Sequence, residues 1–176
     1  QALIMALSHL LRYSLMSNDE QVPLSREVRI VDEYYSIYHV RFGERVRMEW
    51  RISDSLDLTE TMVPSFILQP IVENAVKHGL EYEEEDGKGH IRIECRGEDE
   101  FIVFRVINNG GAIDLQKVAE VMRTPGTGYG IYNICERIEL YYGPGSGLFP
   151  SITEDGETCF TLKLNRTLEK ETPTEA

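Results

Sequence analysis

The sequence has few cysteines and no long apolar run. Its three cysteines are Cys95, Cys135 and Cys159, an odd number without a CxxC pair. This usage indicates neither a disulfide framework nor a zinc site, and it fits a reducing compartment. No apolar stretch approaches the roughly 20 residues that span a bilayer, and no signal peptide opens the chain. We therefore expect a soluble, cytosolic chain.

Positive charge is also scarce. Lysine and arginine number 18 against 30 aspartates and glutamates, which gives a formal net charge of −12. Because such a chain repels a phosphate backbone, and because no basic stripe is interleaved with aromatics, we expect no nucleic-acid partner. The hydrophobic share of 41% in 176 residues predicts one or at most two folded domains.

Helical apolar spacing predicts two helices at the start of the chain. The first contains Leu3, Leu7, Leu10 and Leu11 without an N-cap before them, so the chain begins inside a helix. The second is predicted over residues 25–42 and ended by Gly43, with an apolar face made of Val28, Val31, Tyr35, Tyr38 and Phe42. Because the pattern changes to strand alternation after residue 43, we place an internal boundary there.

The rest of the chain alternates strand and helix patterns. We predict strands over 45–52, 90–96, 101–107, 148–153 and 158–164, a short extended piece over 56–59, and helices over 68–79, 115–122 and 130–142. The turn-like segments GEDE and EDGE join the last four strands into two hairpins. This order predicts an α+β fold, a two-layer α/β sandwich in which helices cover one face of a mixed, mostly antiparallel sheet.

The first candidate site is the helix LQPIVENAVKHG. On its polar side Asn74 and Lys77, at i and i+3, can reach one small anion or hydrated cation together. An exposed ion pair between Glu73 and Lys77 explains the same residues equally well. His78 suits the C-terminal end of the helix dipole, and Pro70 removes a backbone donor and strains the helix.

Two glycine-containing segments are the other candidates. In VINNGGAID, a sharp turn follows a strand, and Asn108 can present its amide to a flat heterocycle; a plain loop is the alternative. In PGTGYGIYN, Gly126, Gly128 and Gly130 lead into a helix, whose free N–H groups and positive dipole end suit a phosphate. The spacing is GxGxG, and neither a GxGxxG nor a GxxxxGK[ST] pattern is present. Each segment alone is weak evidence.

Taken together, the three segments resemble the N, G1 and G2 boxes of the ATP-binding domain shared by histidine kinases, gyrase-type ATPases and heat-shock chaperones. The segments LSHLLRYSL, VPLSREVRIVDEYYSIYHVRFGERV and YYGPGSGLFP are similar to the LytS/YesM-type branch of bacterial sensor histidine kinases. The resemblance covers about residues 3–164.

The resemblance implies ATP and Mg²⁺ as cofactors. It makes Asn74 the metal ligand, beside Glu73 at the catalytic site, and it places Lys77 near phosphate oxygens. Residues 114–125 become a short lid over the nucleotide. The implied nucleotide-binding residues are Asn74, Lys77, His78, Asn108, Gly110, Gly126, Thr127, Gly128, Tyr129 and Gly130.

The chain departs from the family pattern at three positions. Asn108 stands where the family usually has an aspartate that accepts a hydrogen bond from the adenine amino group, and Ala112 replaces the second glycine of that motif. Because a neutral acceptor makes a weaker bond than a charged one, we expect reduced adenine affinity. Pro70 stands where the ATPase relatives have a glutamate that activates water, which favours phosphoryl transfer over hydrolysis.

The family's phosphoacceptor segment, of the form NPHFLFN, is absent. His9 matches the helix after the acceptor, so we interpret it as a surface or interface histidine. The resemblance thus implies three parts: residues 1–43 are the remainder of the dimerisation region, 44–166 are the ATP-binding catalytic domain, and 167–176 are a disordered tail.

Our leading hypothesis is the catalytic domain of a two-component sensor histidine kinase. Its implied partners are ATP, the phosphoacceptor histidine region of the full-length kinase, a second copy of that kinase, and a response regulator. The full-length protein is expected to be membrane-anchored with this domain in the cytoplasm, and the chain alone should not autophosphorylate. The alternative is a degenerate nucleotide-binding regulatory module, a pseudokinase. Pro70 disfavours a third reading, a hydrolysing relative.

Overall fold

A computed structural model describes residues 21–80, 89–110, 113–125 and 129–166. Several sequence predictions lie outside these residues: the first helix with His9, the tail, Ala112, and the glycine segment 126–128. The described elements are, in chain order, β1 (Gln21–Pro23), α2 (Leu24–Phe42), a 3₁₀ turn (Gly43–Arg45), β2 (Val46–Ile52), β3 (Met62–Pro64), α3 (Gln69–Leu80), β4 (Gly89–Glu98), β5 (Phe101–Asn108), α4 (Leu115–Val121), α5 (Tyr129–Tyr142), β6 (Gly147–Ile152) and β7 (Thr158–Asn165).

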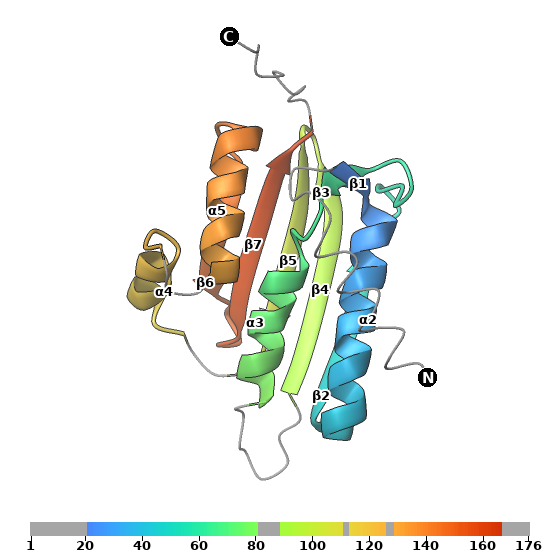
Figure 1. The fold of residues 1–176 in the computed structure, drawn as a ribbon, viewed down its shortest axis with the longest axis vertical. Helices are drawn as coiled ribbons and strands as arrows, with labels where there is room; N and C mark the ends of the chain where they lie inside the picture. The colour runs from blue at the N-terminus through green and yellow to red at the C-terminus, as the bar shows by residue number, and fades with distance from the viewer. Residues whose placement is uncertain (1–20, 81–88, 111–112, 126–128, 167–176) are drawn as a thin grey trace.

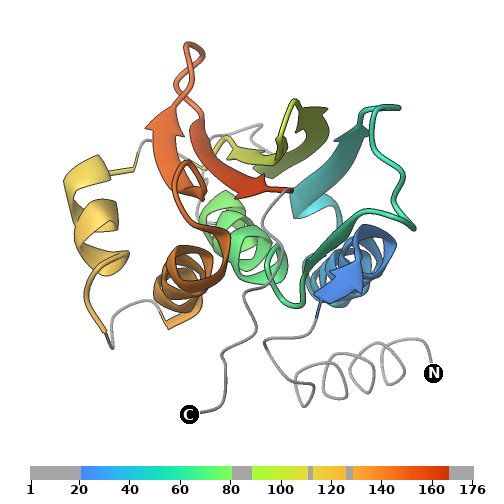
Figure 2. The same cartoon turned by 90° about the horizontal axis from the view of Figure 1, so that it is seen from above.

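Five strands form the main sheet, in the order β2-β4-β5-β7-β6. Strand β2 runs parallel to β4, and the other neighbours are antiparallel. Helices α2, α3 and α5 lie side by side on one face, and α4 lies at the β6 edge (Figures 1 and 2). The predicted two-layer α+β sandwich and both predicted hairpins are confirmed.

Period-two alternation builds the core under the helices. Ile91, Ile93 and Cys95 on β4 are buried, and Phe160, Leu162 and Leu164 on β7 are buried in the same cluster. The neighbours of these residues along each strand point to the other face, because side chains alternate across a strand. The alternation therefore separates the two sides of β7.

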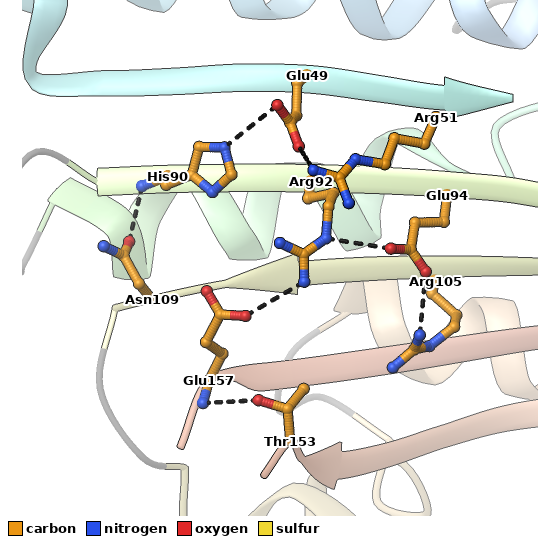
Figure 3. Close-up of polar contacts among 9 residues, drawn as sticks. All are labelled: Glu49, Arg51, His90, Arg92, Glu94, Arg105, Asn109, Thr153 and Glu157. Carbon is orange, nitrogen blue, oxygen red and sulfur yellow. Dashed lines mark hydrogen bonds and ion pairs between the residues drawn. The ribbon is translucent and has the colours of Figure 1, made fainter. Parts of the chain in front are cut away.

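The other face of the sheet has a network of charged side chains (Figure 3). Glu94 pairs with Arg92 at 3.1 Å and with Arg105 on β5 at 3.0 Å. Arg92 also reaches Glu157, at 3.3 Å. Long arginine stems can cover apolar surface, and this face also contains three buried residues, Val103, Ile107 and Cys159. Charged side chains, rather than helices, thus cover this face of the sheet.

The extended piece predicted over 56–59 is wrong. That segment turns instead, because the Asp57 carboxylate accepts hydrogen bonds from the backbone N–H of Thr59 at 2.8 Å and of Glu60 at 3.2 Å. The extended residues come later, as β3, which pairs antiparallel with β1. Strand β1 was missed because three residues are too few to show an alternation.

Helix α2 has the predicted extent, but its predicted buried face is only partly right. It ends at Gly43, whose φ of 62° suits a residue without a Cβ. The fully covered positions are Leu24, Glu27, Ile30, Val31 and Tyr34, whereas Val28, Tyr35 and Tyr38 are only half-buried. All of these apolar residues belong to or pack on the same core as the sheet. The functional boundary at residue 43 stays a prediction.

Candidate functional site

Helix α3 is the central element of the candidate site. Ile71, Val72, Ala75 and Val76 are buried in the core that α3 shares with the sheet. The expected strain at Pro70 is wrong: the helix begins at Gln69, so proline occupies its first turn. A residue there has no acceptor inside the helix for its N–H, and proline therefore loses no hydrogen bond.

The polar side of α3 contains the ion pair that was one of two predicted alternatives. Lys77 Nζ lies 2.8 Å from Glu73 Oε1, with the lysine side chain 59% exposed. The hydrogen bond that Lys77 donates to Glu73 raises the pKa of Lys77, which stays charged. Asn74 is half-buried and makes no side-chain hydrogen bond to another described residue, and His78 is half-buried one turn later. The pair therefore leaves the Asn74 amide available.

Glu73 also faces helix α2. Burial raises the pKa of Tyr34 well above its ordinary value, and the nearby Tyr38 and the negative charge of Glu73 raise it further. The two tyrosine rings lie 4.9 Å apart. The polar side of α3 is thus in electrostatic contact with α2, as the packing of these two helices requires.

Asn108 lies at the end of β5, on the side of the sheet that the helices cover. It follows Phe104 and Val106 at two-residue spacing, and both of those belong to the helix-covered core. Asn108 is 2% exposed, and its Nδ2 has no hydrogen-bond partner among the described residues. Because burying an amide N–H without an acceptor costs about 1–3 kcal/mol, this group is a strong candidate to bind a ligand.

The next residue, Asn109, positions the end of this strand. Its Oδ1 accepts a hydrogen bond from the backbone N–H of His90 at 2.7 Å (Figure 3). Its own backbone N–H donates to the His90 carbonyl at 3.3 Å. The two asparagines therefore have separate roles. Asn109 ties the exit of β5 to the start of β4, while Asn108 lies buried beneath the helices.

The start of α5 packs directly on α3. A Cβ added to Gly130 would lie 2.9 Å from the Cβ of Pro70, closer than two side-chain carbons can approach. This contact therefore requires glycine at position 130, independently of any role of its backbone N–H in binding a phosphate. Pro70 and Gly130 belong to separate motifs in the sequence, and the fold brings them into contact.

Three elements thus build the candidate site: α3 packs on β5, and its first turn contacts the start of α5 (Figure 1). They bring together most of the described residues of the predicted site. Gly110 lies two residues after Asn108, and Tyr129 is the first residue of α5. Gly126, Thr127 and Gly128 lie outside the described residues, so their predicted roles stay predictions.

One buried residue that matters for this arrangement was not predicted at all. Glu27 on α2 is 0% exposed, and its carboxylate accepts backbone hydrogen bonds from the segment just before α3. The only signal in the sequence was a glutamate in the apolar face of an amphipathic helix, which is usually read as a solvated position.

Solved structures of histidine kinases share this fold. The catalytic domain of histidine kinase ThkA matches with a TM-score of 0.63 over 85% of this chain and 98% of its own, at 16% identity. The histidine kinase AdeS of Acinetobacter baumannii matches with a TM-score of 0.62 over 94% of this chain and 76% of its own, at 15% identity. At these identities the likeness establishes the fold.

Sequence comparison establishes the family. The model of the histidine kinase-, DNA gyrase B- and HSP90-like ATPases matches residues 64–168, and a histidine kinase model matches residues 1–46. The chain belongs to this ATPase family and, within it, to the LytS/YesM-type sensor histidine kinases, whose ATP-binding catalytic domain it contains. The predicted family, and with it the use of ATP, is confirmed.

Three relatives illustrate the match. Sensor protein LytS of Streptococcus mutans is 32% identical over 89% of this chain and 27% of its own length. Sensor histidine kinase YpdA of Escherichia coli (strain K12) is 31% identical over 81% of this chain and 25% of its own. Sensor histidine kinase YesM of Bacillus subtilis is 32% identical over 83% and 24%. The chain therefore spans about a quarter of the length of these relatives.

None of the helices in the described ranges is both long enough and apolar enough to cross a lipid bilayer.

Proposed function

We propose that this chain is the part of a sensor kinase that binds ATP with Mg²⁺ and donates the γ-phosphoryl group to a histidine of the full-length protein. A response regulator then receives that group on an aspartate. In such a reaction the protein contributes mainly positioning and charge neutralisation. Pro70 supports transfer rather than hydrolysis, because a proline side chain cannot act as a base.

The buried Asn108, whose Nδ2 has no hydrogen-bond partner within the described part of the chain, is the observation that best supports nucleotide binding. The edge of adenine offers an amino donor at N6 next to an acceptor at N1. An asparagine amide matches this pair, since its oxygen accepts from N6 while its nitrogen donates to N1. Adenine would therefore satisfy the Nδ2 group that lacks a partner among the described residues.

Asn74 is proposed to be the metal ligand. In the described residues, no group of three or more His, Cys, Asp or Glu side chains could hold a metal ion. This fits Mg²⁺, which keeps several waters and takes one or two protein ligands besides the phosphates. The bound ion would draw together the phosphate oxygens and neutralise charge that develops on them.

The remaining site residues are assigned to the phosphates and the base. Lys77 and His78 would face phosphate oxygens, with Glu73 holding Lys77 by its ion pair until the nucleotide competes for the ammonium. Gly110 would lie near the base, and the N–H groups of the helix-start segment would face the triphosphate. That segment is made of Gly126, Thr127, Gly128, Tyr129 and Gly130.

The proposed partners come from the whole kinase. We propose that the full-length protein is a membrane-anchored homodimer and that residues 1–43 belong to its dimerisation region, which also supplies the phosphoacceptor histidine. One solved structure with this fold is histidine kinase ThkA in complex with response regulator protein TrrA, at 17% identity and a TM-score of 0.63. A response regulator is the corresponding partner proposed for this chain.

Replacing Asn74 with alanine should remove the effect of Mg²⁺ on ATP binding. We expect the wild-type chain to bind ATP at least about tenfold more tightly with Mg²⁺ than in EDTA, a difference of about 1.4 kcal/mol. In Asn74→Ala the two dissociation constants, measured by calorimetric titration, should become equal. The exposed Glu139→Ala on α5 should behave as wild type. If the wild-type chain showed no saturable ATP binding, the proposal would fail.

Phosphoryl transfer needs a separate test with the upstream segment restored. We expect the longer protein to acquire acid-labile phosphate from ATP and the 176-residue chain to acquire none. Nucleotide binding without any phosphorylation of the longer protein would indicate the pseudokinase instead. Steady release of inorganic phosphate would indicate a hydrolase.

Replacing Asn108 with leucine should weaken binding of the base. Leucine has a similar size, but it can neither accept from N6 nor donate to N1 of adenine. With two hydrogen bonds lost, at about 0.5–1.5 kcal/mol each, we expect Asn108→Leu to bind ATP at least about fivefold more weakly in calorimetric titration. A flipped amide can also serve hypoxanthine, which has an acceptor at O6 and a donor at N1, so the wild-type chain should bind ITP within about tenfold of ATP. Unchanged ATP affinity of Asn108→Leu would remove Asn108 from the base site.

A further inference from the structure

Glu27 connects two helices at the buried end of α3. Its Oε1 accepts a hydrogen bond from the N–H of Phe66 at 2.8 Å, and its Oε2 accepts from the N–H groups of Ile67 and Leu68, each at 3.0 Å. Phe66 has a φ of 58°, a conformation that bulky residues rarely adopt. Consecutive N–H groups bent around one carboxylate form an anion-binding concavity.

This carboxylate replaces a local cap for α3. Leu68 accepts the first helical hydrogen bonds, from Ile71 and Val72, so it is the N-cap residue, and it has no side-chain oxygen. A negative charge at a helix N-terminus also interacts favourably with the helix dipole. Because Glu27 is fully buried, its charge is compensated by protein groups rather than by water.

The connection is reciprocal. The N–H of Leu24, the first residue of α2, donates to the carbonyl of Thr61 at 2.8 Å, and the N–H of Ser25 donates to the carbonyl of Leu58 at 2.8 Å. Strands β1 and β3, which precede the two helices, pair with each other. The start of α2 is therefore held by the segment that leads into α3, and the start of α3 is held by Glu27 of α2, so the two helix starts are tied together.

We propose that Glu27 is a positioning residue for the nucleotide site: from α2, its carboxylate sets the axial position and rotation of α3, and thereby the placement of Asn74 toward the metal. The inference rests on the proposed function, because it needs Asn74 to act through Mg²⁺. Helix α2 also connects the ATP-binding fold to the segment before residue 21. A displacement of α2 would therefore alter metal-dependent nucleotide binding through Glu27.

The test compares ATP affinity with and without Mg²⁺ in the whole chain. Glu27→Gln keeps the size of the side chain but turns an N–H donor toward backbone donors. We expect the gain in affinity due to Mg²⁺ to fall by about fivefold or more, a usual size for coupling between sites. Affinity in EDTA should change by less than about twofold, because Asn108 on β5 does not depend on this cap. Loss of general stability would weaken both affinities together.

The matched control is Asp32→Asn. It also removes a carboxylate from α2, but one that accepts a hydrogen bond from Trp50 Nε1 on β2, at 2.8 Å, instead of capping α3. This variant should keep the wild-type effect of Mg²⁺. If folded Glu27→Gln kept it too, the inference would be overturned while the proposed function stood. If wild type itself showed no effect of Mg²⁺, the proposed function would fail first.

A measurement on the wild-type chain covers the case in which Glu27→Gln does not fold. Coupling between two sites is mutual. If the hydrogen bonds to Glu27 strengthen metal-dependent ATP binding by some factor, then binding of Mg²⁺ with ATP must stabilise those hydrogen bonds by the same factor. Hydrogen exchange at the amides of Phe66, Ile67 and Leu68 should slow on adding Mg²⁺ to the ATP-saturated chain, by more than at the amides of β7. Equal slowing at both places would contradict the inference.

Discussion

A chain that begins at Glu44 should not fold, whereas one that begins at Gln21 should fold and bind ATP. The shorter chain corresponds to the domain boundary that the sequence predicts. It lacks five apolar side chains that are at most 7% exposed: Val22, Leu24, Ile30, Val31 and Tyr34. At about 1.5–3 kcal/mol for each buried side chain, their loss approaches the whole stability of a domain, about 5–15 kcal/mol.

The same truncation removes the cap of α3. Without Glu27, the N–H groups of Phe66, Ile67 and Leu68 lose their acceptor, and the apolar side of α3 loses its cover on one flank. We expect thermal melting followed by circular dichroism to show a cooperative transition for the chain from Gln21 and none for the chain from Glu44. A cooperative transition in the shorter chain would show that the domain folds without α2.

Replacing Gly130 with valine should destabilise the fold and weaken ATP binding together. Its Cβ would meet the ring of Pro70 at 2.9 Å, and a proline ring cannot turn away as a flexible side chain can. Overpacking of this kind costs about 1–3 kcal/mol, and the branched methyl groups of valine add to it. Because relief requires the start of α5 to move from α3, the nucleotide residues on the two helices separate.

The control for this variant is Glu139→Val, which places valine at an exposed position of the same helix. It should cost only the small helix propensity of valine, about 0.5 kcal/mol, and leave ATP affinity unchanged. Equal stability of Gly130→Val and Glu139→Val in urea denaturation would show that the Pro70 contact is not tight. Reduced stability with unchanged ATP affinity would separate the contact from the site.

Regular patterns in the sequence predicted most of the fold. Two-residue alternation places every strand of the main sheet, and the helical spacing of Ile71 and Ala75 places α3 with its buried side inward. The three motifs also led to the correct family before any coordinates were considered. These features are local, since strand and helix periods depend only on neighbours a few residues apart.

The misinterpretations concern contacts between distant segments. Glu27 lies 39 to 41 residues from its donors, so nothing near it in the sequence marks the position as buried. Pro70 was interpreted as removing a hydrogen bond from the helix. That interpretation fails because the helix begins at Gln69, where the missing N–H has no helical acceptor. The conformation of segment 56–59 depends on which acceptor its backbone N–H groups bond to. The N–H of Thr59 donates to the Asp57 carboxylate instead of to a neighbouring strand.

The sequence by itself determined the class of protein and the order of the main-sheet strands and the helices between them, and it supplied the family motifs whose residues we propose to face the nucleotide. Only the tertiary structure decided why two of those residues suit their places: Asn108 is buried without a partner for its Nδ2 among the described residues, and Gly130 contacts Pro70. It also decided that α2 and α3 form one unit. The physical reason is that burial, capping and close packing depend on segments that meet only when the chain folds.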